Sequence, residues 1–205
     1  MPDGSDRTAA RPGELLLILG GARSGKSTTA ERLARDGGRV LFIATAEALD
    51  EAMQKRIAAH RRYRPEHWDT LEEPIHVTRA VRPLIDRYDT FVLDCLTLWV
   101  SNLLLQDEEA SDTEGAVLET VGRLLDLIDA ADGRWILVSN EVGQGIVPAS
   151  PLGREYRDVL GRVNQLVASR ADKAYLMVAG LGLELKSLAH RSSGPAQGDS
   201  RLEAG

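Results

Sequence analysis

The sequence predicts an α/β fold built on a doubly wound, mostly parallel sheet flanked by helices. Short, almost wholly apolar segments alternate with longer stretches in which apolar residues recur every three or four positions. The first apolar segment also runs directly into a glycine-rich loop that ends in Gly-Lys-Ser at residues 25–27. A strand, a loop of this kind and a following helix are the opening unit of P-loop NTPase-like folds.

Each predicted strand is a short apolar run bounded by polar residues or glycine, which is typical of strands covered on both faces. The runs are Leu15–Leu19, Val40–Ala44, Thr90–Asp94, Trp135–Ser139 and Ala174–Ala179. In a doubly wound sheet, ligands bind beyond the carboxyl ends of the strands. We therefore expect the residues directly after each run to hold the chemistry.

The predicted helices lie between these strands, and the first follows the glycine-rich loop over residues 27–35. The others are marked by apolar positions at helical spacing. These are Leu49, Met53, Ile57 and His60 or Arg61; Val117, Val121, Leu124, Leu125 and Ile128; and Tyr156, Val159, Leu160, Val163, Leu166 and Val167. We expect residues 14–188 to form one domain, with residues 1–13 and 189–205 as polar, disordered tails.

Length, charge and cysteine content narrow the classes of function. A chain of 205 residues can bury one sizeable core, and a formal net charge of −6 argues against a general nucleic-acid binder. The single cysteine, Cys95, excludes an internal disulfide. No apolar run approaches the roughly 20 residues of a membrane span, and residues 1–13 lack the apolar core of a signal peptide. We expect a cytoplasmic protein.

The glycine-rich loop matches the phosphate-binding pattern G-x-x-x-x-G-K-[ST] at every specified position. It consists of Gly20, Gly21, Ala22, Arg23, Ser24, Gly25, Lys26 and Ser27. Glycines let backbone N–H groups turn toward phosphate oxygens, and the helix that follows adds its positive end. We expect Lys26 to reach the β- and γ-phosphates of a nucleotide and Ser27 to bind Mg²⁺. The alternative, a glycine-rich turn of chance composition, is disfavoured by the strand and helix on either side.

A second magnesium ligand is predicted at Asp94, which ends the third apolar run. A strand-terminal aspartate can instead serve as a turn or cap residue, an interpretation weakened by the intact phosphate loop. The sequence contains neither the N-K-x-D segment of a regulatory GTPase nor the LSGGQ-type signature of a transporter ATPase. These features favour a small-molecule kinase.

Residues 55–64, KRIAAHRRYR, are strongly basic in a chain that is net acidic. A solvated helix face is the usual explanation of such a run. Here the run follows the second predicted strand, and clustered arginines suit bidentate binding of phosphate oxygens. Within it, His60 borders the apolar stripe and is either a packed structural residue or a nucleophile. Flanking positive charge favours a neutral imidazole, which can attack phosphorus.

Two further segments lie where ligands are expected. Residues 140–148, NEVGQGIVP, follow the fourth predicted strand and form either a shaped binding loop or a long surface connection. The next helix carries Arg154, Arg157 and Arg162, which are either anion contacts or solvent-facing charges.

Five stretches taken together are far more specific than the phosphate loop alone. They are GGARSGKS (20–27), IATAEALDEAMQKRIAAHRRYRPEHW (43–68), DCLTLWVSNLL (94–104), NEVGQGIVP (140–148) and GREYRDVLGRVNQLVASRAD (153–172). They resemble the bifunctional adenosylcobinamide kinase/adenosylcobinamide-phosphate guanylyltransferase family of cobalamin biosynthesis, in order, over about residues 15–186. The most specific parts are the H-x(3)-R-P-x-x-W run and N-E-V-G-x-G-I-V-P.

The resemblance implies two reactions in one chain. The γ-phosphate of GTP or ATP first passes to the aminopropanol hydroxyl of adenosylcobinamide. A histidine then attacks the α-phosphorus of GTP, and the resulting GMP-histidine transfers GMP to the cobinamide phosphate, giving adenosylcobinamide-GDP. The histidine falls on His60. The implied nucleotide contacts fall on Gly20 to Ser27, Ala44, Thr45, Ala46, Arg61, Arg62, Tyr63, Arg64, Glu72 and Asp94, with Mg²⁺ at Ser27 and Asp94.

Two departures from the family pattern are visible. Some members carry Glu in place of Asp94, and some carry two adjacent histidines where this chain has Ala59 and His60. The resemblance implies a corrinoid substrate and a homo-oligomer, commonly a trimer, while charge and composition predict no nucleic-acid partner and no membrane span. Two alternatives remain open: a P-loop kinase of another small hydroxyl substrate, with a structural His60 and no covalent intermediate, and a nucleotide-sensing regulatory protein that binds GTP without turnover.

Overall fold

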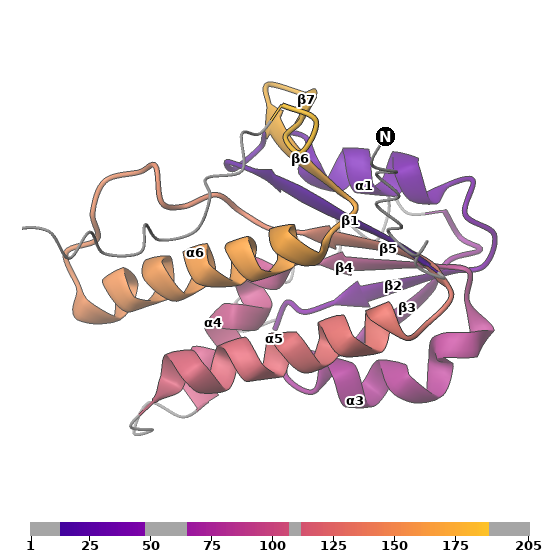
Figure 1. The fold of residues 1–205 in the computed structure, drawn as a ribbon, viewed down its shortest axis with the longest axis horizontal. Coiled ribbons are helices and arrows are strands. Elements are labelled where there is room, and N and C mark those ends of the chain that lie inside the picture. Colours follow the sequence, from indigo (N-terminus) through magenta and orange to yellow (C-terminus); the bar gives the residue numbers. More distant parts are fainter. Residues whose placement is uncertain (1–12, 48–64, 107–111, 189–205) are drawn as a thin grey trace, which may run out of the picture.

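The computed structural model describes residues 13–47, 65–106 and 112–188, which contain one seven-stranded sheet with helices on both faces (Figure 1). The strand order is β3-β2-β4-β5-β1-β6-β7. The strands are β1 (Gly13–Gly20), β2 (Val40–Ala44), β3 (Asp69–Glu72), β4 (Thr90–Asp94), β5 (Gly133–Val138), β6 (Lys173–Val178) and β7 (Leu181–Glu184). All neighbouring pairs are parallel except β6 and β7, which form an antiparallel hairpin. The predicted mostly parallel α/β fold is confirmed.

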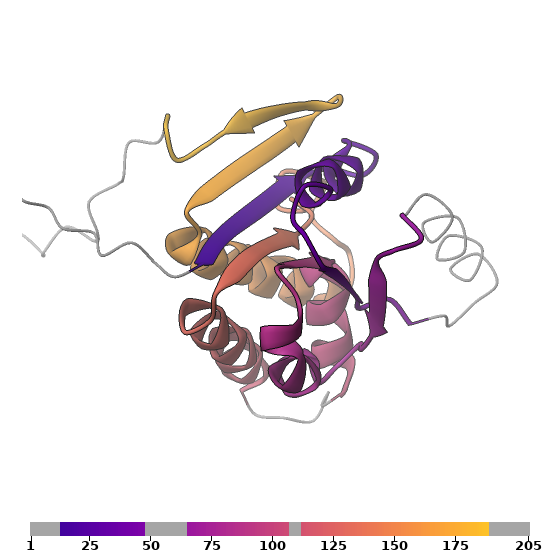
Figure 2. The same ribbon diagram turned by 90° about the vertical axis from the view of Figure 1, so that its right-hand side faces the viewer.

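The helices divide unequally between the two faces. They are α1 (Lys26–Ala34), α3 (Val77–Val81), α4 (Leu96–Gln106), α5 (Thr113–Asp129) and α6 (Pro151–Arg170), with a 3-10 helix η1 (Arg82–Arg87) after α3. Figures 1 and 2 show α1 on one face of the sheet and α3, α4, α5 and α6 on the other. Within the described ranges, no helix has both the length and the apolarity to cross a membrane.

Several elements differ from the sequence prediction. The strands at Val40–Ala44 and Thr90–Asp94 match residue for residue, whereas β1, β5 and β6 are shifted or extended at their ends. β3 and β7 were not predicted, because they are edge strands whose side chains are mostly exposed and therefore lack an apolar run. Helix α4 was also missed, since it is apolar around most of its circumference and shows no clear helical period.

The core is split by the sheet because successive side chains of a strand point to opposite faces. On the face of α3 to α6, the core includes Leu15, Leu17, Ile43, Leu93, Trp135 and Leu137. On the face of α1, it includes Leu16, Ile18, Phe42, Val92, Ile136 and Ala30. Phe91 and Trp135 are register partners on β4 and β5, and their rings stack with centroids 4.2 Å apart. Continuous burial of both faces explains why these strands are apolar throughout.

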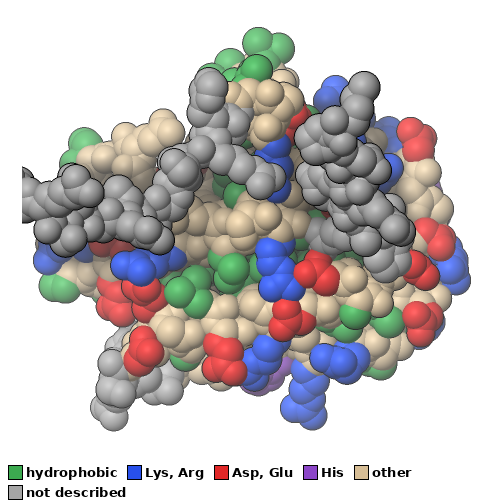
Figure 3. Space-filling view, viewed as in Figure 1, with side chains coloured by type: hydrophobic (Ala, Val, Ile, Leu, Met, Phe, Trp, Pro, Cys, Tyr) green, Lys and Arg blue, Asp and Glu red, His purple; other side chains and the backbone are tan. Residues whose placement is uncertain are grey.

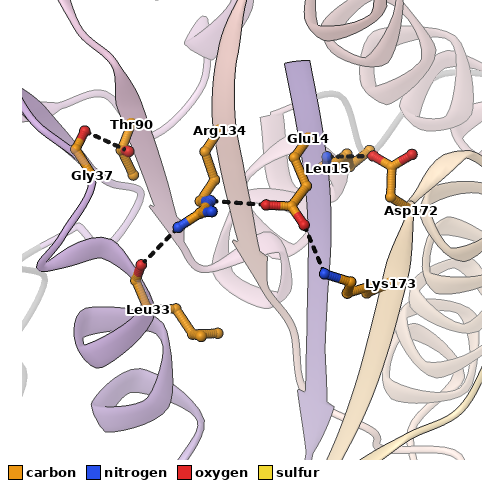
Figure 4. A network of polar contacts seen from close by, with 8 residues as sticks. All are labelled: Glu14, Leu15, Leu33, Gly37, Thr90, Arg134, Asp172 and Lys173. Carbon is orange, nitrogen blue, oxygen red and sulfur yellow. Dashed lines mark hydrogen bonds and ion pairs between the residues drawn. The ribbon is translucent and has the colours of Figure 1, made fainter. Parts of the chain in front are cut away.

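Ion pairs join three strands at the amino end of the sheet (Figure 4). The Glu14 carboxylate accepts from Arg134 Nε at 2.9 Å and from Lys173 Nζ at 3.0 Å. Beside it, the Leu15 N–H donates to Asp172 Oδ2 at 2.6 Å. This network lies at the edge opposite the strand ends that carry the predicted site.

The outer surface mixes acidic and basic side chains over α5 and α6, as the face in Figure 3 shows. Hydrophobic side chains gather instead at the β6–β7 hairpin, where Val178, Leu181 and Leu183 are exposed.

Candidate active site at the carboxyl edge of the sheet

The predicted phosphate loop joins the end of β1 to the start of α1. Two of its glycines have backbone angles that other residues rarely adopt, with φ of 151° at Gly20 and 97° at Gly25. A Cβ at Gly20 would also lie 2.5 Å from the carbonyl oxygen of Met177 on β6. The strand, loop and helix follow one another as the motif predicts, and the glycines are required by the geometry of the loop.

Two polar side chains of this loop are buried. Lys26 is 8% exposed, and its Nζ donates to the Gly21 carbonyl at 2.6 Å. Ser24 is also 8% exposed, and its Oγ has no hydrogen-bond partner among the described residues. A buried hydroxyl without a partner is costly unless a ligand satisfies it, and a phosphate oxygen is a suitable acceptor.

The strand order brings the other predicted contacts to the same edge. Glu72, Ala44 and Asp94 are register partners across β3, β2 and β4 and so form one row at the carboxyl ends of these strands. The strand β5 separates this row from β1 and the phosphate loop. The predicted nucleotide contacts on these strands therefore share one edge, as expected for a doubly wound sheet.

Cys95 links Asp94 electrostatically to the phosphate loop. Burial, and then the negative charge of Asp94, raise the pKa of the Cys95 thiol to about 11, while the positive charge of Lys26 opposes this shift. Asp94 and Lys26 thus act on the same thiol, although they come from the ends of β4 and β1. The lysine and the predicted metal ligand lie on the same side of the sheet.

The Thr45 hydroxyl makes two hydrogen bonds that the sequence did not predict. Its side chain is fully buried, and its Oγ1 donates to the Cys95 carbonyl at 2.7 Å and accepts from the Cys95 N–H at 2.9 Å. The hydroxyl therefore fixes the backbone that directly follows Asp94. Neighbouring Ala46 is half-buried.

The loop after β5 is anchored on both sides. The Glu141 N–H donates to the Gly20 carbonyl at 3.1 Å, at the start of the phosphate loop. On the other side, the Asn140 N–H donates to Thr97 Oγ1 at 2.7 Å and its carbonyl accepts from Asn164 Nδ2 at 3.1 Å. Residues 140–148 thus begin as a shaped loop beside the phosphate site rather than a free surface connection.

The sequence analysis missed Thr97, Asn102 and Asn164, which hold this edge together. All three are polar residues in helices that pack on the sheet, and both Thr97 and Asn164 are buried. A polar residue within an apolar helix face was the available signal, because buried polar groups are normally hydrogen-bonded.

The three arginines of α6 that were predicted as possible anion contacts bind other groups of the protein. Arg154 Nη1 donates to the carbonyls of Pro148 and Ala149 and thereby closes the end of the loop. Arg157 pairs with its neighbour Asp158, and Arg162 pairs with Glu114 of α5. These contacts favour structural roles over anion binding.

Part of the predicted site lies outside the described residues. This applies to His60 and to its basic neighbours Arg61, Arg62, Tyr63 and Arg64. The described part contains no group of three or more His, Cys, Asp or Glu side chains placed to hold a metal ion. The half-buried Ser27 hydroxyl and the Asp94 carboxylate are oxygen donors that suit Mg²⁺, which usually takes its remaining ligands from phosphates and water.

Comparison with known proteins identifies the family. A family model described as cobinamide kinase / cobinamide phosphate guanyltransferase matches residues 16–185. The bifunctional adenosylcobalamin biosynthesis protein CobP of Pseudomonas aeruginosa is 49% identical over 173 residues, covering 83% of this chain and 96% of the relative. The corresponding CobU proteins of Escherichia coli K12 and Salmonella typhimurium are 41% and 40% identical over 180 residues, covering 84% of this chain and 99% of each relative. The chain described here belongs to the cobinamide kinase / cobinamide phosphate guanyltransferase family.

Proposed function

We propose that this bifunctional kinase and guanylyltransferase of cobalamin biosynthesis carries out both reactions with one nucleotide site, using His60 as a covalent GMP carrier. The observation that carries the proposal is the shared carboxyl edge, where the phosphate loop, Asp94 and the end of β2 lie together. The chain that leaves this edge at Thr45 contains His60.

In the kinase reaction, the loop N–H groups and Lys26 bind the β- and γ-phosphates of GTP or ATP. Ser27 and Asp94 would hold Mg²⁺, which offsets phosphate charge when it is bound. The aminopropanol hydroxyl of adenosylcobinamide attacks the γ-phosphorus, forming a new P–O bond as the bond to the β-phosphate oxygen breaks. The hydroxyl proton is released and the nucleoside diphosphate leaves. The buried Ser24 hydroxyl, which lacks a hydrogen-bond partner within the described part of the chain, supports a role of the loop in phosphate binding.

In the guanylyltransferase reaction, the neutral imidazole of His60 attacks the α-phosphorus of GTP. A P–N bond forms and the bond from the α-phosphorus to the β-phosphate oxygen breaks, so that pyrophosphate leaves. A phosphate oxygen of adenosylcobinamide phosphate then attacks the same phosphorus, yields adenosylcobinamide-GDP and frees the imidazole. A covalent intermediate divides one difficult exchange between two anions into two displacements.

Labelled GTP tests the covalent step. Incubation with α-labelled GTP is expected to leave acid-labile, alkali-stable label on the protein, and mass spectrometry should place one GMP on His60. His60→Ala should abolish the label while phosphorylation of adenosylcobinamide continues, because the phosphate loop is unchanged. His67→Ala is the matched control, since His67 is exposed and has no predicted role. Wild-type protein without label would refute the histidine mechanism.

Removing the loop lysine tests whether the two reactions share one site. Lys26→Ala should lower both γ-phosphate transfer and GMP labelling by about a hundredfold or more, since Lys26 supplies the buried positive charge of the loop. Loss of only one activity would show that the reactions use separate nucleotide sites. Binding of GTP with no product from any corrinoid acceptor would instead support a nucleotide sensor.

Association of subunits stays a prediction, which light scattering of the purified protein can check.

A further inference from the structure

Helix α4 carries two side-chain hydrogen-bond donors one turn apart, Trp99 and Asn102, on a mostly apolar helix. Trp99 Nε1 donates to the carbonyl of Ile75 at 2.9 Å. Asn102 Nδ2 donates to the carbonyl of Thr45 at 2.8 Å and to that of Pro74 at 3.1 Å. Residues three apart on a helix are neighbours. Both donors therefore face the two segments that follow β2 and β3 at the carboxyl edge of the sheet.

The two carbonyls that Asn102 binds belong to segments that directly follow two different strands, here called the exits of β2 and β3. Thr45 directly follows β2, and Pro74 lies two residues after the end of β3. These are the strands whose ends supply Ala44 and Glu72 to the row beside Asp94. One amide group therefore joins the two exits that lie farthest from the phosphate loop in the strand order.

The chemistry of this contact is specific to asparagine. Its amide nitrogen carries two hydrogens, and here each is used on a separate carbonyl. An apolar side chain of similar size would leave both carbonyls without this partner. Aspartate would place a negative oxygen against them, and serine can donate only one hydrogen bond.

We propose that Asn102 is a positioning residue for guanylyl transfer, which holds the exits of β2 and β3 in the geometry that the second reaction needs. The inference rests on the proposed function, because the chain leaving at Thr45 contains His60. The kinase reaction shares Asp94 with this edge but depends chiefly on the loop after β1, which is separated from β2 by β4 and β5. Loss of the amide should therefore impair the two reactions unequally.

Two substitutions of graded severity test this role in the full chain. For Asn102→Leu, the rate of labelling by α-labelled GTP is expected to fall about tenfold or more, because small misplacements of reacting groups cause losses of this size. The kcat for phosphorylation of adenosylcobinamide should change by less than about threefold. Asn102→Ser should give an intermediate labelling rate, since it retains one donor.

Asn164→Leu is a matched comparison, since it removes the same kind of amide from the exit of β5 beside the phosphate loop. We expect it to lower the kinase rate at least as much as the labelling rate. Thermal unfolding of each variant gives its folded fraction, to which both rates are normalised.

The outcomes separate the inference from the proposed function. Equal losses of both activities in Asn102→Leu, or an unchanged labelling rate, would overturn the positioning role while wild-type labelling still supports the histidine step. If Asn102→Leu does not fold, the ratio of the two rates in Asn102→Ser decides the question, and an unchanged ratio counts against the proposal. Wild-type protein that takes up no label overturns the histidine step and this inference with it.

Discussion

Side chains at the carboxyl edge hold backbone in place as well as facing the ligand site. Thr45 uses its hydroxyl on both backbone groups of Cys95, and Lys26 donates to the carbonyl of its own loop. The pKa of the Cys95 thiol is affected by the charges of both Asp94 and Lys26. At the scale of single residues, the site is held by polar groups whose partners are main-chain atoms.

The thiol of Cys95 gives a prediction at this scale. Its pKa of about 11 leaves only about one thiolate in a thousand at pH 8, and the thiolate is the reactive form. We expect native protein to react with iodoacetamide at pH 8 about a hundredfold more slowly than urea-unfolded protein, as followed by mass spectrometry. The chain has one cysteine, so any adduct reports on this site alone. Rapid alkylation of native protein would contradict the raised pKa.

At the scale of elements, the turn between β6 and β7 supports the phosphate loop. The Gly180 N–H donates to the Ser24 carbonyl at 2.9 Å, and Gly180 has a φ of 83°. A Cβ added at Gly25 would lie 3.2 Å from the Cα of Gly180, so the turn and the loop are in close contact. The hairpin, which the sequence did not predict, therefore forms one wall of the predicted cradle.

Two glycine substitutions should change stability in opposite directions. Gly180→Ala is expected to lower the free energy of unfolding by about 1 kcal/mol, because a Cβ is strained at positive φ even where it meets open space. Gly161→Ala, within α6, should raise it by about 0.5–1 kcal/mol, because its Cβ also meets open space and alanine favours helix. Urea unfolding measures both values. Stabilisation by Gly180→Ala would show that the turn tolerates other residues.

At the scale of the whole molecule, the two ends of the sheet differ in the roles of their polar residues. The carboxyl edge carries the predicted site, while the amino end is joined by the network around Glu14 (Figure 4). Burial alone would raise the pKa of Glu14, but the hydrogen bond and charge of Lys173, together with Arg134, outweigh it and hold the pKa below its ordinary 4.5. The charged carboxylate is thus favoured in the folded state.

This shift predicts how stability depends on pH. A carboxylate with a lowered pKa in the folded state contributes stability above its unfolded pKa, and that contribution is lost as pH falls through the folded value. Wild-type protein should exceed Glu14→Gln in free energy of unfolding by about 1 kcal/mol near pH 6, and the difference should shrink as the pH falls below 4.5. Glu119→Gln is the control, because its ion pair with Arg123 is largely exposed. A difference that is constant with pH would exclude the ionic contribution.

Much of this molecule is determined by the sequence alone, because the signals are local. Strands covered on both faces must be apolar, so Val40–Ala44 and Thr90–Asp94 were predicted residue for residue. The phosphate loop was predicted from its glycines and from Lys26 and Ser27, whose spacing is set by the ligand. The family match includes His60. The role of His60 stays a prediction, because this residue lies outside the described residues.

The tertiary structure decided what depends on partners distant in the chain. The insertion of β5 between β4 and β1, the pairing of the exposed edge strand β3 with β2, and the two hydrogen bonds of Asn102 to Thr45 and Pro74 all join segments far apart in the sequence. A hydrogen bond from a helix to a main-chain carbonyl carries no sequence signal at the acceptor, because every residue has that carbonyl. Local pattern therefore determined the strands and the phosphate loop, whereas long-range pairing determined how the edge that bears the site is held together.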